Sequence, residues 1–143
     1  MTDITRLDAL RALYDPVRER SAKKELPQLD AHATRLVGLS PFVVIGSGHA
    51  ATGALDASPR GGAPGFVRVP DAHTLLLPDA PGNNRLDTLE NVVSHGVAGA
   101  PVGLLFLLPG MDETLRVNGR AWLSTDAALR ERCTEEPTGR VPR

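Results

Sequence analysis

Apolar residues recur at helical spacing through the first forty positions of the chain. Ile4, Leu7, Leu10 and Leu13 follow this spacing, and Asp15 with the proline after it interrupts it. Further apolar positions at the same spacing precede a second break after Leu39. The pattern predicts three helices, at residues 3–14, 17–25 and 29–39.

From Phe42 onward the pattern changes to short runs of Val, Leu, Ile and Phe between turns rich in Gly, Pro and Asp. These runs predict strands at residues 42–45, 53–58, 66–69, 74–77, 102–108 and 113–124. Two more helices are predicted, at residues 85–93 and 126–133. Short strands at this spacing are typical of a barrel or a sandwich, so we expect a mainly β (α+β) fold.

The chain contains no internal repeat and no linker-like tract, and 143 residues is the size of one domain. We therefore expect one structural domain, in which a helical segment at residues 1–41 packs on a strand-rich part at residues 42–143.

Composition narrows the classes of partner. The formal net charge is −1 and the basic residues are scattered, so we expect no nucleic-acid partner. The longest apolar run, residues 102–108, has the length of a strand, and we expect no membrane span.

A single cysteine, Cys133, and an N-terminus without a signal-like apolar stretch favour the cytoplasm. Aromatic residues make up only 3% of the chain, so a core of Leu, Val and Ala would leave apolar surface, which favours a homodimer.

Two groups of polar residues are candidates for holding an anion. Asn83, Asn84 and Arg85 offer two amides and a guanidinium where a predicted helix exposes unpaired backbone N–H groups. Arg60 precedes a Gly-Gly pair that lets a ligand approach the backbone closely. Each group also has a structural reading, the asparagines as a helix cap and Arg60 as a solvated turn residue.

Other chemistries have weaker signals. The four histidines lack the spacing of a metal site, so we expect no metal. Ser94 and His95 do not lie in a nucleophile elbow, and Cys133 has no catalytic signature around it. The Gly61-Gly62 pair precedes a proline and a strand, which excludes a dinucleotide-binding fingerprint.

Five motifs in order resemble the FMN-binding split-barrel family of the pyridoxamine 5′-phosphate oxidases, in one bacterial branch of it. The motifs are SPRGGAPGFV (residues 58–67), LPD (77–79), GNNRLDTL (82–89), GLLF (103–106) and ETLRVNGRA (113–121). The resemblance covers about residues 40–125.

The resemblance implies a six-stranded antiparallel split β-barrel of Greek-key type, forming a homodimer with FMN bound between the subunits. It implies that the flavin ring lies near Ser58 and Arg60, and that Thr114 reaches the ring. Arg116 lies two positions after Thr114 on one strand and therefore shares its face. This position makes Arg116 a candidate for contact with the flavin, weaker than Thr114. The implied cofactor-binding residues are Ser58, Arg60, Asp79, Asn83, Asn84, Arg85, Thr114 and Arg116.

The resemblance also implies an FMN-dependent oxidoreductase acting on a small substrate, with NAD(P)H as a candidate electron donor. The alternative is a non-catalytic flavin or small-ligand binding module on the same barrel, and a deazaflavin or haem protein is a third reading. True pyridoxamine phosphate oxidation is not expected. The basic C-terminal residues of those enzymes have no counterpart here, and Asn83-Asn84 replaces their Ser-Arg pair. In relatives of the resembled branch a segment like residues 139–143 leads into a further strand, which is not found before Arg143.

Overall fold

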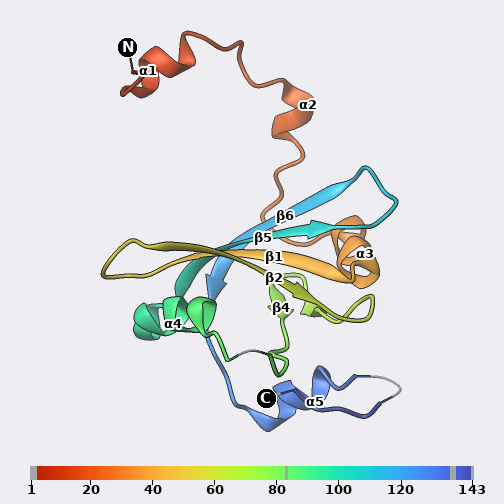
Figure 1. Cartoon of the computed structure of the whole chain (residues 1–143). Helices are drawn as coiled ribbons and strands as arrows, with labels where there is room; N and C mark the ends of the chain where they lie inside the picture. The colour runs from red at the N-terminus through yellow and green to blue at the C-terminus, as the bar shows by residue number, and fades with distance from the viewer. Residues whose placement is uncertain (1–2, 83, 136–137, 143) are drawn as a thin grey trace.

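A computed structural model describes residues 3–82, 84–135 and 138–142. Its centre is an antiparallel sheet of four strands in the order β2-β1-β5-β6 (Figure 1). The strands are β1 (Phe42–Gly48), β2 (Leu55–Gly61), β5 (Ala100–Leu107) and β6 (Thr114–Ala121). β2 lies at an edge, which explains how it tolerates Pro59, a residue without a backbone donor.

A second sheet consists of the hairpin β3 (Arg68–Asp71) and β4 (Thr74–Leu76). It packs with helix α3 (Ala31–Leu39) against one face of the larger sheet. The Asp30 carboxylate caps α3 by accepting a hydrogen bond from the Ala33 backbone N–H at 2.7 Å. The fully buried core between these layers consists of Val37, Val43, Val67 and Phe106.

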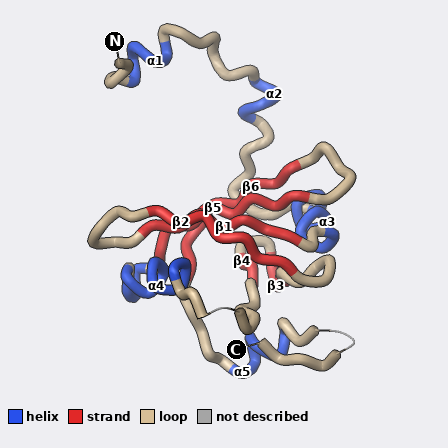
Figure 2. The backbone as a smooth tube through the Cα atoms, viewed as in Figure 1, coloured by secondary structure: helices blue, strands red, loops and turns tan. Residues whose placement is uncertain are grey.

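Helix α4 (Asp87–Ser94) packs on the same face, over β1 and β2, and a short 3₁₀ helix, η1 (Gly96–Ala98), follows it. Helix α5 (Ala127–Arg132) lies near the C-terminus, on the same side of the sheet as α4 (Figures 1 and 2). We call this face of the four-stranded sheet the covered face.

The opposite face, here called the uncovered face, carries no packed element among the described residues. Strand pairing places Val44 beside Leu105 and Gly46 beside Gly103 on it. These four residues are half-buried, and the side chains toward β6, such as those of Thr114 and Arg116, are exposed.

The fold is therefore a mixed α+β structure with antiparallel sheets, and the six strands of the described residues lie in two separate sheets. The predicted strands occur near their expected positions, but β1 is longer. The predicted strand ended at residue 45, whereas Gly46, Ser47 and Gly48 continue β1, because each pairs with a residue of β2.

The N-terminal arm, residues 3–28, contains α1 (Leu7–Arg11) and α2 (Glu19–Ala22), neither of which buries a residue. Figure 1 shows it extending from the body, on the other side of the sheet from α4 and α5. The segment at residues 1–41 was expected to pack on the strands, and in the structure only α3 does so. The physical reason is that the breaks around Pro16 and Pro27 leave two helices of five and four residues, too short to present a continuous apolar stripe to the body.

Candidate functional site

Two sets of polar contacts fix α4 on the covered face. The Asn91 side-chain amide donates to Ser47 Oγ at 3.0 Å, and both residues are buried. Asp56 Oδ2 accepts two hydrogen bonds, from Ser58 Oγ at 2.6 Å and from Thr88 Oγ1 at 3.1 Å. Asp56 of β2 is thus linked to Thr88 in the first turn of α4, and this contact sets the distance between β2 and α4.

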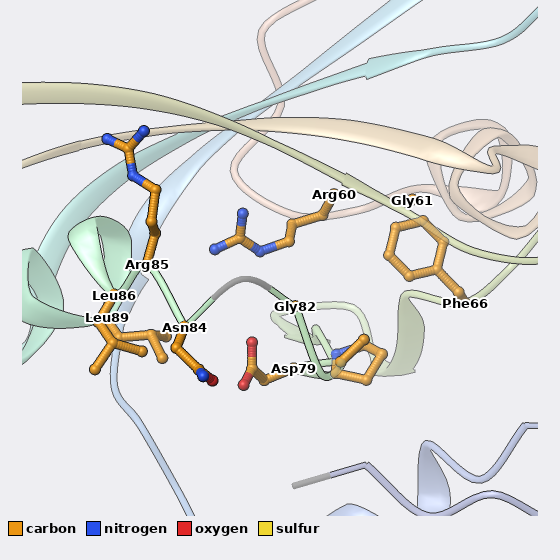
Figure 3. A pocket seen from close by; sticks show the side chains of 11 residues that line it. Arg60, Gly61, Phe66, Asp79, Gly82, Asn84, Arg85, Leu86 and Leu89 are labelled. Atoms are coloured by element: carbon orange, nitrogen blue, oxygen red, sulfur yellow. The ribbon is translucent and has the colours of Figure 1, made fainter.

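A pocket of about 180 Å³ lies between the end of β2 and the segment leading into α4 (Figure 3). Its polar lining includes four residues named from the sequence: Arg60, Asp79, Asn84 and Arg85. Its apolar lining includes Phe66, Pro78, Leu86 and Leu89. The structure therefore brings together half of the predicted site residues.

Arg60 extends from β2 across this pocket toward Asn84, and the Asp79 carboxylate points into the same space (Figure 3). The Arg60 guanidinium donates a hydrogen bond to the Pro59 carbonyl at 3.0 Å. Gly61 lies beside it in the lining, so no side chain closes that part of the wall. An anion that enters here meets Arg60 and is opposed by Asp79.

Arg85 makes contacts at the edge of the pocket. Its Nη2 lies 3.0 Å from Asp87 Oδ2 at the start of α4, and its side chain is 75% exposed. Asn84 has a left-handed backbone, with φ of 59°, which turns the chain into the helix. Asn83 was also predicted to contact the cofactor, and it lies outside the described residues.

The electrostatics of this region centre on Asp56. The hydrogen bond from Ser58 is the largest cause that holds the pKa of Asp56 below its ordinary value. The Thr88 hydroxyl and the positive charges of Arg60 and Arg85 act in the same direction, and burial opposes them. Asp56 is therefore an ionised neighbour of the pocket at neutral pH.

Thr114 and Arg116 do not join this group. They pair with Leu107 and Leu105, and these residues point away from Phe106 of the core. Both are exposed on the uncovered face, whereas Ser58 and Arg60 lie on the covered face beside Ile45 and Val43. Within one chain the seven predicted residues that the structure describes therefore separate into two surfaces.

Cys133 follows α5 and lies within reach of the charge of Arg68 on β3. Burial raises the pKa of the Cys133 thiol, and the charge of Arg68 partly offsets this rise. The Arg68 guanidinium donates to the Thr134 carbonyl at 3.2 Å and so attaches the C-terminal segment. Among the described residues, no three His, Cys, Asp or Glu side chains converge in a way that could hold a metal ion.

Four residues of these contacts were not predicted from the sequence: Asp56, Thr88, Ser47 and Asn91. A signal for Asp56 was present, because it lies two positions before Ser58 on a strand and must share its face. The pairing of Ser47 with Asn91 had no such signal, since it depends on how α4 lies across β1.

Comparisons of the chain with models of known protein families, with curated proteins and with solved structures found no match. In the part of the chain that the structure describes, every helix is too short or too polar to cross a membrane.

Proposed function

We propose that this protein binds FMN at the pocket beside Arg60 and acts as an FMN-dependent oxidoreductase on a small substrate. The observation that carries the proposal is the convergence of Arg60, Asn84 and Arg85 around one pocket, from two segments that are distant in sequence. Guanidinium and amide groups are the donors that a phosphate group needs. The flavin supplies the redox chemistry when bound, and the protein orients it.

The size of the pocket favours a site shared between two subunits. Ligand pockets that enclose a whole drug-sized molecule have about 300–1,000 Å³. This pocket, at about 180 Å³, accommodates the phosphate of FMN with part of the ribityl chain and leaves the flavin ring outside. A homodimer supplies the missing wall, and the split-barrel arrangement of the resembled family is the frame that we propose for it.

Thr114 and Arg116 fit the same scheme. They lie on the uncovered face, away from the pocket of their own chain, and in the proposed dimer they contact a flavin whose phosphate a second copy holds. The apolar residues Val44 and Leu105 on that face gain cover in such a dimer.

Calorimetric titration with FMN tests the proposal. The protein should bind FMN, and Arg85→Ala should weaken binding by about 1.5 to 3 kcal/mol through loss of a charge-assisted contact. Arg35→Ala, which removes an exposed arginine of α3, is the matched control and should leave the affinity unchanged. Unchanged affinity in Arg85→Ala would remove Arg85 from the site, and no binding by the unaltered protein would refute the proposal.

Activity separates the enzyme from a non-catalytic flavin carrier. Reduction of the bound flavin by NADH or NADPH, followed by turnover on a quinone, a dye or oxygen, supports the oxidoreductase. Stable binding without reduction by either donor supports the carrier.

A further inference from the structure

The hydrogen bonds of Ser58 restrict what it can offer to a ligand. A serine hydroxyl has one hydrogen to donate, and an ionised carboxylate only accepts. Ser58 donates its hydrogen to Asp56 Oδ2 at 2.6 Å, so its oxygen retains only acceptor capacity. Thr88 is committed to the same carboxylate oxygen at 3.1 Å.

This arrangement makes the neighbourhood of Ser58 unsuitable for phosphate. Phosphate oxygens are acceptors, so they find no donor at the Ser58 hydroxyl, and the negative charge of Asp56 repels them. Arg60 lies two positions further along β2, on the same face and at the wall of the pocket. The separation of these two positions along a strand is about 7 Å.

The geometry points to a polarity of the site, that is, to one end that accepts a hydrogen bond from the ligand and another that binds its phosphate. This inference rests on the proposed FMN binding. Ser58 accepts a hydrogen bond from an N–H or O–H of the ligand, while the phosphate binds only at the Arg60 end. Asp56 is the positioning residue that fixes this direction. The ligand class that fits has an anionic group at the Arg60 end and a hydrogen-bond donor on the side of Ser58. In FMN the available donors are the ring N3–H and the ribityl hydroxyls.

Titration with FMN and riboflavin tests this polarity, because riboflavin lacks the phosphate. Ser58→Ala should weaken both ligands by the same factor, about 3- to 10-fold, since one hydrogen bond to a shared part of the two molecules is lost. Ser21→Ala in the exposed helix α2 is the matched control and should change neither affinity. FMN methylated at N3 identifies the donor: weaker binding than FMN assigns the ring N–H, and equal binding assigns a ribityl hydroxyl.

Asp56→Asn supplies a second test, with inorganic phosphate as the probe. Removing the negative charge should raise phosphate affinity about 3-fold, because the repulsion of the phosphate by Asp56 is lost. Asp112→Asn removes the same charge from an exposed turn between β5 and β6 and should leave phosphate affinity unchanged.

The outcomes separate this inference from the proposed function. A loss in Ser58→Ala that is confined to FMN and absent for riboflavin would assign Ser58 to the phosphate and overturn the polarity, while leaving FMN binding intact. An unchanged affinity for both flavins would also overturn it. Failure of the unaltered protein to bind either flavin would refute the proposed function itself, and the inference with it.

Discussion

The two faces of the four-stranded sheet differ in what lies against them. The covered face holds the apolar core around Phe106, the polar contacts of α4 and one wall of the pocket. The uncovered face has small and apolar residues at its centre and exposed Thr114 and Arg116 toward β6. Strand alternation places neighbouring residues on opposite faces, and it therefore divides between two surfaces the site residues that the resemblance groups together.

The largest expected effect is on the free energy of unfolding, from a change in the buried core of the covered face. Phe106→Ala should lower the free energy of unfolding by about 3 to 5 kcal/mol, because it leaves a cavity at a fully buried position. Leu107→Ala, its neighbour on the uncovered face, should cost about 1 kcal/mol or less in dilute samples. Urea unfolding measures both. A cost for Leu107→Ala that matches the Phe106 value would show that the two faces are equally buried.

Arg60→Ala should weaken FMN binding by about 1.5 to 3 kcal/mol, because the pocket loses one of its two guanidinium groups. Arg116→Ala on the uncovered face should have a smaller effect, which depends on protein concentration if the flavin is held by a second copy. Calorimetry at two protein concentrations measures this difference. Equal, concentration-independent losses would contradict the division into two surfaces.

Asn91→Ala should lower stability by about 1 to 3 kcal/mol, because it removes the donor to the buried Ser47 hydroxyl and leaves a small cavity. Combining it with Ser47→Ala should cost less than the sum of the two single changes, since both members of one contact are then absent. Thermal unfolding of the four proteins provides the cycle. Strict additivity would show that the contact does not couple α4 to β1.

The smallest expected effect concerns pH. The folded-state pKa of Asp56 is lowered, chiefly by the Ser58 hydrogen bond, so its contribution to stability is fully present above the unfolded-state pKa of about 3.9. That contribution is lost as the pH falls from this value through the folded-state pKa. Asp56→Asn should therefore make the free energy of unfolding fall less steeply at acidic pH. Near neutral pH, the dependence on pH should be the same as in the unaltered protein. An unchanged acid limb would remove Asp56 from the charge balance of the covered face.

Much of the fold could be predicted from local pattern. The apolar runs located all the strands within a few residues, and the amphipathic pattern around Leu89 and Val92 located α4. The extension of β1 through Gly46 and Gly48 could not be predicted, because glycines signal a turn locally and only the pairing with β2 keeps them in the strand. The detachment of the N-terminal arm was equally hidden, since an amphipathic pattern predicts a helix but not the surface that it contacts.

For the candidate site, the sequence predicted which side chains could bind a ligand better than it predicted where each of them lies in the fold. Arg60, Asp79, Asn84 and Arg85 were named from motifs, and the structure places all four around one pocket. Thr114 lies apart from them within a single chain, because register and pleat decide which face a strand residue joins. The Asp56 contact with Thr88 depends on the packing of α4 across β2, which no local pattern specifies.

The visible absorption spectrum of the purified protein, recorded before and after addition of FMN and removal of unbound ligand, tests the central claim most directly. The account predicts the bands of a bound oxidised flavin, diminished in Arg60→Ala. A protein that stays colourless after incubation with FMN would contradict it, and the pocket beside Arg60 would then need another ligand.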